Sequence, residues 1–297
     1  MKIETINGPA SFTSYHSDAP DIPVLLSVPH AGRDYPSVLL DNLRVPAAEL
    51  IRLEDRYADR LIQPAIGAGF PAIVAHRARA WIDLNRAESD LDAGMFAGPN
   101  AECPASPSIK ARGGLGLFPR RLQSCGELWR TPMLQSDAEV RIEQLHRPYH
   151  QRISHTLAAM RDRFGIAILI DVHSMPPLSG AAHAGLAKDA PPKIVVGDRF
   201  GRSAASIFAE LAMRQSAAKG LKAALNSPYS GDYTLQAHGN PALGIHALQL
   251  EFDRSLYLDA DLREPTHQLK SIAAIVTDIA AEICEYALGR TFAQAAE

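Results

Sequence analysis

The stretch Ile168–Ser174, ILIDVHS, decides the fold class, because an apolar run typical of a fully buried strand ends there in an acid and a histidine. Two other stretches share the pattern. Val24–His30 (VLLSVPH) ends in a histidine, and Ile245–Phe252 (IHALQLEF) carries a lone glutamate. Parallel sheets are built from such apolar runs and bind ligands at the carboxyl ends of their strands. The three stretches therefore predict a sheet that brings two imidazoles and one carboxylate to a common edge.

Short β-rich apolar runs alternate along the chain with stretches of helical periodicity. The expected strands are residues 24–28, 72–76, 80–84, 167–172, 194–196 and 245–252. The expected helices are residues 47–66, 137–164, 202–220 and 264–288. The last helix has a buried stripe at helical spacing, formed by Leu269, Ile272, Ile275, Ile279 and Ile283. The alternation predicts one α/β domain over residues 1–297, with a mostly parallel mixed central sheet and helices on both faces.

Composition excludes several classes of protein. The 297 residues carry a net charge of −3, which offers no electrostatic basis for binding nucleic acid or an anionic membrane. The three cysteines form no CxxC pair, so a disulfide scaffold or a cysteine zinc site is not expected. The first residues lack a signal-peptide pattern, and no apolar run reaches the roughly 18 residues of a membrane span. We expect a cytoplasmic enzyme, and the oligomeric state is left open.

Two stretches are expected to be long loops. Residues 87–132 are rich in Gly, Pro and Arg, and residues 175–193 contain four prolines and several small residues. Loops of this length in a compact domain are more often functional than idle. We therefore expect both to form the rim or lid of a site.

Two histidines stand where expected strands end. His30 lies in SVPHAG, where Pro29 stops strand pairing and Gly32 permits a turn. His173 lies in DVHS, and Asp171 points to the same side of the strand, placed to orient the imidazole. Either histidine, taken alone, is also consistent with a polar residue that merely caps a strand.

A third ligand is expected to be a carboxylate. LEDRYADRL, residues 53–61, offers Glu54, Asp55 and Asp59, and spacing alone does not decide among them. An acid on a helix, such as Asp59, more often belongs to a solvated face. Two histidines and one carboxylate with an open position are the usual ligands of a hydrolytic zinc, which lowers the pKa of a bound water.

Glu251 interrupts an apolar strand, where a carboxylate is costly to bury unless it is paired or functional. Beside a metal-bound water it would act as general base, whereas the structural alternative is a buried ion pair with an arginine. The segment RAWIDLNR adds Arg79, Asn85 and Arg86. Arginine holds a carboxylate through its planar fork, so this group suits a substrate with free carboxylates. The alternative is a set of surface arginines on the rim of a sheet.

As a set, the motifs resemble those of the N-formylglutamate amidohydrolases, a family similar in fold to the zinc carboxypeptidases and the aspartoacylases. They occur in the order of that family and cover the chain from about residue 20 to residue 260. The matching motifs are SVPHAG at His30, the acid of LEDRYADRL, IDLNR ending at Arg86, RPYH at 147–150, DVHS at His173, VVGD ending at Asp198, SGDYTLQAHGNP at 230–241 and IHALQLEF at 245–252.

The resemblance implies a divalent metal, zinc before others, held by His30, Asp55 and His173, with Asp55 matching the second acid of the family motif. It implies Glu251 as the general base. It further implies catalytic or substrate contacts from residues that line or orient the pocket: Arg79, Asn85, Arg86, Asn226, Tyr233, His238 and His246.

The expected activity is hydrolysis of an N-formyl, or other N-acyl, amino acid such as N-formylglutamate, which gives formate and the free amino acid. The chain departs from the family pattern after DLNR, where it reads AESDLDAGMF, and in GGLGLFPRR. Specificity for glutamate is therefore less firmly implied than the metal chemistry. Two alternatives remain: a metallocarboxypeptidase or amidase acting on a peptide or cell-wall fragment, and a non-catalytic scaffold of the same fold. A dinucleotide-binding enzyme is not supported, because no expected strand is followed by GxGxxG.

Overall fold

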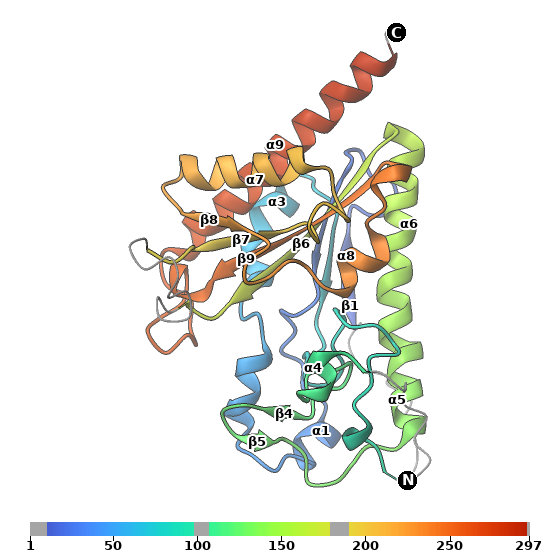
Figure 1. Cartoon of the computed structure of the whole chain (residues 1–297), viewed down its shortest axis with the longest axis vertical. Helices are drawn as coiled ribbons and strands as arrows, with labels where there is room; N and C mark the ends of the chain where they lie inside the picture. Colours follow the sequence, from blue (N-terminus) through green and yellow to red (C-terminus); the bar gives the residue numbers. More distant parts are fainter. Residues whose placement is uncertain (1–10, 98–106, 179–189, 296–297) are drawn as a thin grey trace.

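A computed structural model describes residues 11–97, 107–178 and 190–295. Its centre is a seven-stranded sheet (Figure 1). In spatial order the strands are β1 (Phe12–Tyr15), β3 (Ala72–Ala75), β2 (Val24–Val28), β6 (Ala167–Met175), β9 (Ile245–Asp253), β7 (Ile194–Gly197) and β8 (Ala223–Leu225). Strands β3, β2, β6 and β9 run parallel, β1 is antiparallel to β3, and β7 is antiparallel to β9 but parallel to β8. The predicted α/β class with a mostly parallel mixed sheet is confirmed.

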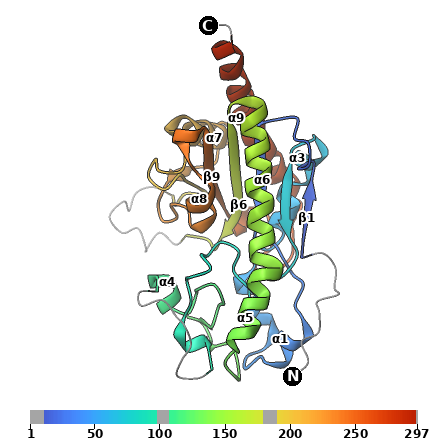
Figure 2. The same ribbon diagram turned by 90° about the vertical axis from the view of Figure 1, so that its right-hand side faces the viewer.

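Helices cover both faces of this sheet, as predicted (Figures 1 and 2). One face is covered by α2 (Ala58–Leu61), α3 (Gln63–Gly67), α7 (Ser206–Ala218) and α9 (Leu269–Ala295). The other is covered by a continuous helical rod, formed by α5 (Gln135–Arg141), a π-helical turn (Ile142–His146) and α6 (Arg147–Phe164). The predicted stripe of α9 is confirmed, because Ile272, Ile275, Ile279 and Ile283 are buried.

Side-chain alternation sorts the central strands between two cores. The even-numbered residues of β2, β6 and β9, such as Leu26, Ile170 and Leu250, pack against α9 and its neighbours. The odd-numbered residues face α6, and the early ones, such as Leu25 and Leu169, are apolar. Each such buried side chain contributes about 1.5–3 kcal/mol to folding.

Toward the carboxyl ends, the face that α6 covers changes from apolar to polar. Its odd-numbered positions there are Ser27, Asp171, His173, Gln249 and Glu251, all of them buried. The pairing of strands aligns Ser27 with Asp171, Asp171 with Gln249, and His173 with Glu251. One edge of one face therefore concentrates the polar side chains of three neighbouring strands.

The structure corrects two element predictions. Residues 80–84 form no strand, because β1 already occupies the free edge of β3 and the segment instead turns with Trp81 N bonded to the Ala78 carbonyl. Residues 47–66 form no single helix. They divide into a 3-10 helix (Ala47–Leu53), α2 and α3, because Glu54 is extended and Tyr57 adopts a left-handed backbone at φ 61°.

The remaining elements form a layer below the carboxyl edge of the sheet in Figure 1. It contains α1 (Ser37–Asp41), a 3-10 turn (Ala93–Met95), α4 (Ile109–Arg112) and the hairpin of β4 (Arg121–Leu122) and β5 (Gly126–Glu127). Helix α8 (Tyr233–His238) and short 3-10 turns (Pro241–Leu243, Arg254–Leu256) flank β9. Among the described residues we find no helix with the combined length and hydropathy of a bilayer span.

Candidate metal centre and adjoining cavity

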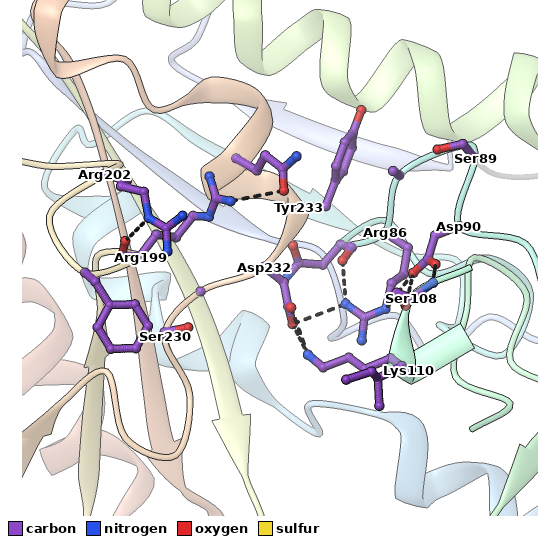
Figure 3. Close-up of a pocket in the computed structure, with 16 residues that line it drawn as sticks. Arg86, Ser89, Asp90, Ser108, Lys110, Arg199, Arg202, Ser230, Asp232 and Tyr233 are labelled. Carbon is purple, nitrogen blue, oxygen red and sulfur yellow. Dashed lines mark hydrogen bonds and ion pairs between the residues drawn. The ribbon is translucent and has the colours of Figure 1, made fainter. Parts of the chain in front are cut away.

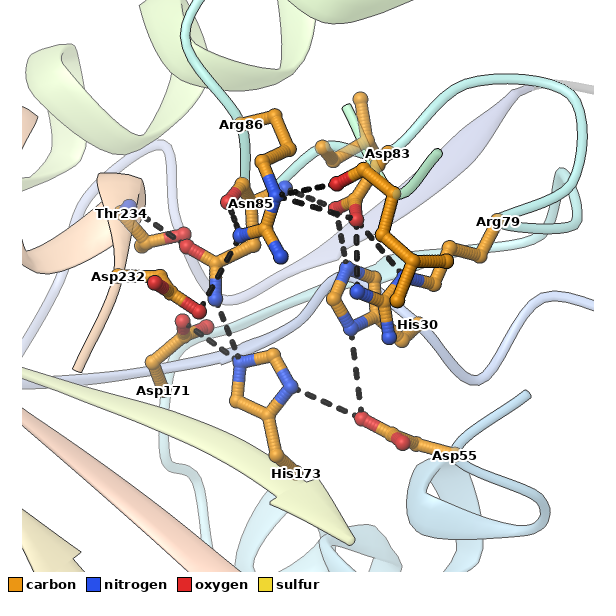
Figure 4. A network of polar contacts seen from close by, with 12 residues as sticks. His30, Asp55, Arg79, Asp83, Asn85, Arg86, Asp171, His173, Asp232 and Thr234 are labelled. Carbon is orange, nitrogen blue, oxygen red and sulfur yellow. Dashed lines mark hydrogen bonds and ion pairs between the residues drawn. The ribbon is translucent and has the colours of Figure 1, made fainter. Parts of the chain in front are cut away.

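Three side chains converge at the carboxyl edge of the sheet (Figure 4). His30 follows β2, Asp55 follows the 3-10 helix Ala47–Leu53, and His173 lies in β6. Asp55 Oδ2 lies 3.4 Å from His30 Nδ1 and 2.8 Å from His173 Nδ1. All three groups are buried, and their ligand atoms lie within 4.8 Å of one another. The structure thus brings together the three residues that the sequence suggested as metal ligands.

The outer nitrogen of each imidazole is held by its own carboxylate. His30 Nε2 lies 2.7 Å from Asp83 Oδ1. His173 Nε2 lies 2.9 Å from Asp171 Oδ2, which is the contact expected from the sequence. An Nε2–H that donates to a carboxylate leaves a lone pair on Nδ1. His30 Nδ1 is buried without a hydrogen-bond partner among the described residues. Two nitrogen lone pairs and a carboxylate oxygen aimed at one point fit a divalent cation.

The three acids of segment 53–61 differ in their hydrogen-bond partners. Arg254 Nη2 donates to Asp55 Oδ1 at 3.0 Å, which leaves Oδ2 facing the two imidazoles. The Glu54 carboxylate accepts hydrogen bonds from the Tyr35 hydroxyl and from Arg56 Nη1. Asp59 accepts a bidentate bond from Arg33, on a partly exposed surface. Of the three acids in that segment, the geometry therefore directs Asp55 to the centre.

The loop that carries His30 is packed tightly against the chain that follows β3. A Cβ at Gly32 would lie 2.2 Å from the Arg77 carbonyl oxygen, so only glycine allows this approach. The Asp55 amide donates to the His30 carbonyl at 2.9 Å. These backbone contacts fix the first imidazole and the carboxylate relative to one another.

Glu251 lies on the same face and at the same edge, because it is the register partner of His173 in the β6–β9 pair. Gln249 Nε2 donates to Glu251 Oε1 at 2.9 Å. Burial raises the pKa of Glu251 to about 7, although the charge of His173 acts in the opposite direction. The structure shows no arginine paired with this carboxylate among the described residues, so the ion-pair alternative for Glu251 is not what the geometry favours.

The segment 79–86 crosses over the two imidazoles. Arg79 Nε and Nη2 both lie 2.8 Å from Asp83 Oδ2, so this arginine supports the acceptor of His30. Burial disfavours the charged Asp83, but the charges of Arg79 and His30 hold its pKa well below the usual range. Asn85 Nδ2 lies 3.3 Å from His173 Nε2, and Asn85 Oδ1 accepts from the Thr234 amide at 2.8 Å.

A row of neutral histidines lies behind this segment, with His146 and His150 on the helical rod and His238 on α8. His146 Nε2 bonds to the Arg86 carbonyl and His150 Nε2 to the Leu84 carbonyl, both at 2.8 Å. His150 Nδ1 lies 2.9 Å from His238 Nε2. Because His150 Nε2 donates to a carbonyl, its Nδ1 accepts from His238. Burial lowers the pKa of His238 to about 4, which keeps this ring neutral.

A cavity of about 590 Å³ adjoins the centre and shares Asn85 with it (Figure 3). Arg86 and Tyr233 line the cavity, as the sequence suggested for a substrate pocket. Arg86 Nη1 lies 3.2 Å from Asp232 Oδ2. The segment 87–132 contributes Ala87, Ser89, Asp90, Ser108, Ile109 and Lys110 to the lining. In the other long segment, residues 179–189 lie outside the described residues, so its role as a rim stays a prediction.

Three of the residues suggested for the pocket lie elsewhere. His238 sits behind Tyr233, in the histidine row. Asn226 binds both the amide and the carboxylate of Asp198, and so anchors the turn after β7. His246 lies near the start of β9, opposite Ile168, with its ring 4.7 Å from that of Phe208. His246 is thus at the other end of the strand from Glu251, because strand residues advance by about 3.3 Å each.

Comparisons with known proteins assign the chain to one family. The family model of N-formylglutamate amidohydrolase matches residues 22–258, which is most of the chain. The chain belongs to the N-formylglutamate amidohydrolase family. It is 30% identical to an N-formylglutamate deformylase of Pseudomonas putida over 256 residues (82% of this chain and 88% of the relative). It is 31% identical to an N-formylglutamate deformylase of Pseudomonas aeruginosa over 258 residues, with the same coverage.

Solved structures of similar proteins extend the family match to the fold. An N-formylglutamate amidohydrolase from Ralstonia eutropha JMP134 superposes with a TM-score of 0.84 at 27% identity, over 94% of this chain and 98% of the other. A gene product from Agrobacterium tumefaciens superposes with a TM-score of 0.63 at 16% identity, over 97% of each chain, and shows the fold alone. The N-formylglutamate amidohydrolase architecture therefore extends over nearly the whole chain.

Sequence reasoning missed several residues of this N-formylglutamate amidohydrolase family member. Asp83 and Arg254 orient two of the three converging ligands, and Asp232 pairs with Arg86 on one wall of the cavity. The sequence could have indicated Asp83, because it is an acid among the apolar residues of WIDL. Arg254 and Asp232 lie in polar surroundings, where nothing in the sequence distinguishes them from surface charges.

Proposed function

We propose that the chain hydrolyses the amide bond of an N-formyl amino acid, with N-formylglutamate, the compound after which its family is named, as the leading substrate. The observation that carries the proposal is the convergence of His30 Nδ1, Asp55 Oδ2 and His173 Nδ1, with Glu251 beside His173 on the same face. Membership of the family and the names of the Pseudomonas relatives support the same activity.

His30, Asp55 and His173 would hold the divalent metal, and zinc suits a set of two nitrogens and one oxygen. When bound, the ion supplies polarisation of the scissile carbonyl and lowers the pKa of a water molecule. Asp83 and Asp171 keep the imidazoles in the tautomer that presents Nδ1. Arg254 restrains the carboxylate from the opposite side.

Glu251 acts as the general base in this proposal. Its carboxylate takes a proton from the attacking water as the new C–O bond forms, then gives that proton to the amide nitrogen as the C–N bond breaks. The products are formate and a free amino acid. A pKa of about 7 suits a group that both accepts and donates a proton near neutrality.

Arg86, Asn85 and Tyr233 line the cavity that adjoins the three converging ligands, where Arg86 would hold the α-carboxylate of the substrate. Arg79 lies beside Asp83 at the centre and would balance oxyanion charge. The single-domain organisation and the cytoplasmic location stay predictions.

The test combines metal analysis with a substrate screen. Purified protein is expected to contain close to one equivalent of a divalent metal and to release formate from N-formyl amino acids. N-acetyl amino acids and short peptides test the range of acyl groups and the peptidase alternative. Fully metal-loaded protein that releases no formate from any N-formyl amino acid would contradict the proposal.

A further inference from the structure

The cavity has two walls that differ in charge balance (Figure 3). One wall carries Arg86 and Lys110, and the other carries Arg199 and Arg202 from the turn after β7. Asp232 lies between them, on the side of Arg86 and Lys110. The cavity therefore presents cationic groups from opposite directions to whatever occupies it.

The cations of the first wall already have carboxylate partners. Lys110 Nζ lies 2.6 Å from Asp232 Oδ2, and Arg86 Nη1 lies 3.2 Å from the same oxygen. Arg86 Nε also lies 3.9 Å from a carboxylate oxygen of Asp90. This wall is close to neutral before any ligand arrives.

The guanidiniums of the second wall lack such partners. Within residues 11–97, 107–178 and 190–295, no carboxylate oxygen lies within 4.0 Å of Arg199 or Arg202. Arg199 Nη2 donates to Gln236 Oε1 at 3.2 Å, and Arg202 Nε donates to the Arg199 carbonyl at 3.1 Å. Burial and the charge of Arg202 together lower the pKa of Arg199. Two adjacent cations with only neutral acceptors favour an anionic ligand.

The turn that carries these arginines is held in place before binding. Asp198 Oδ1 accepts bonds from the Gly201 amide at 3.0 Å and from Asn226 Nδ2 at 2.7 Å. The Arg199 amide donates to the Ser230 carbonyl at 2.7 Å. Arg199 itself adopts a left-handed backbone, at φ 53°. A preformed turn of this kind lowers the ordering cost of ligand binding.

Two exposed apolar side chains complete the lining. Ile109 is 80% exposed and Phe200 is 67% exposed, and both line the cavity although neither is covered by the described chain. Large apolar groups next to unpaired guanidiniums match a ligand with a short aliphatic stem that ends in an anion.

We propose that Arg199 and Arg202 form the recognition site for a carboxylate at the end of the substrate side chain. The assignment rests on the proposed amidohydrolase function and names the residues that would select an acidic side chain in its substrate. The two arginines are specificity residues, and neither contacts the converging ligands of the metal centre.

The first test compares two isosteric substrates, N-formyl-L-glutamate and N-formyl-L-glutamine, with the metal-loaded enzyme. The double variant R199M/R202M removes both charges and keeps an unbranched side chain. We expect its kcat/KM for the glutamate substrate to fall about 10- to 100-fold, because charged hydrogen bonds are lost, and its kcat/KM for the glutamine substrate to change less than about threefold. R199K/R202K keeps the charges and should recover part of the preference.

The matched control is R161M/R163M, which removes two arginines from the far end of α6, outside the cavity lining. For both substrates, kcat/KM of this control should equal that of the unmodified enzyme. Equal losses on both substrates in R199M/R202M, or no loss on either, would overturn the assignment while formate release still upheld the proposed function.

A second test measures binding without turnover. Calorimetry with glutarate, a dicarboxylate that lacks the amide, is expected to show binding to the metal-loaded protein that weakens at least about tenfold in R199M/R202M. Glutaramide, which has no carboxylate, should not discriminate between the two proteins. If glutarate binding depends on the arginines but no N-formyl amino acid is hydrolysed, the recognition site stands and the proposed function fails. Glutarate affinity that is unchanged in R199M/R202M would overturn the assignment of the recognition site.

Discussion

His173 and Glu251 are register partners on the adjacent parallel strands β6 and β9, so both side chains leave the same face of the sheet at the same edge. Side chains directly opposite one another on neighbouring strands lie about 5 Å apart at Cβ. This pairing places Glu251, a buried carboxylate, next to His173, one of the three converging ligands. Glu251 is hydrogen-bonded to Gln249 and to none of the three ligands, so the candidate base is distinct from the candidate metal ligands.

Replacing Glu251 with Gln is expected to reduce kcat about 100- to 10,000-fold, because the amide cannot accept the proton of the attacking water. Metal content, measured by mass spectrometry, and KM should change little. Glu210→Gln, on the exposed surface of α7, is the control and should keep full activity. Near-normal turnover by Glu251→Gln would refute the assignment of the base.

Replacing His173 or Asp55 with Ala is expected to remove most of the bound metal as well as the activity, since each supplies one of three ligands. Metal content after dialysis, compared with that of the unmodified protein, measures the loss. His155→Ala alters an exposed histidine of α6 and should retain the metal. Full metal occupancy in both site variants would mean that the three residues do not form a metal site.

Asp83→Asn and Asp171→Asn test the carboxylates behind the imidazoles. Each is expected to weaken metal affinity about 10- to 100-fold, because an amide no longer selects the tautomer that presents Nδ1. Competition with a chelator of known affinity gives the dissociation constants. Asp162→Asn, an exposed acid of α6, serves as the matched control. Unchanged affinity in both site variants would assign the two acids a purely structural role.

The stability of the protein should fall in mild acid, partly through His238. Its pKa is lowered from about 6.5 in the unfolded chain to about 4 in the fold. Between these values the unfolded chain binds more protons, so the free energy of unfolding decreases as the pH falls from about 6.5 toward 4.

In His238→Gln this dependence should weaken by about 1 kcal/mol per pH unit over that range. Urea denaturation at several pH values measures it, and contributions shared by both proteins cancel in the difference. The exposed His155→Gln should leave the slope unaltered. A slope in His238→Gln equal to that of the unmodified protein would contradict a neutral buried ring.

Local pattern was enough to predict five of the seven strands of the sheet, three long helical regions and the strand ends that carry His30, His173 and Glu251. These features depend on the burial and periodicity of residues that are neighbours in the sequence. The break within 47–66 was not predictable in this way. The 3-10 helix, α2 and α3 all bury apolar side chains, so the apolar spacing continues through a left-handed Tyr57.

Tertiary structure alone decided which polar groups meet. Asp83 reaches His30 across 53 positions and Arg254 reaches Asp55 across 199. The family resemblance implied that Asn226, His238 and His246 line or orient the pocket. The fold instead assigns them to a turn anchor, a histidine row and the opposite end of β9. A side chain's residue type shows what it can bond. Only the packing of distant segments decides which partner it meets, and whether a charge such as Arg199 lacks a carboxylate partner among the described residues.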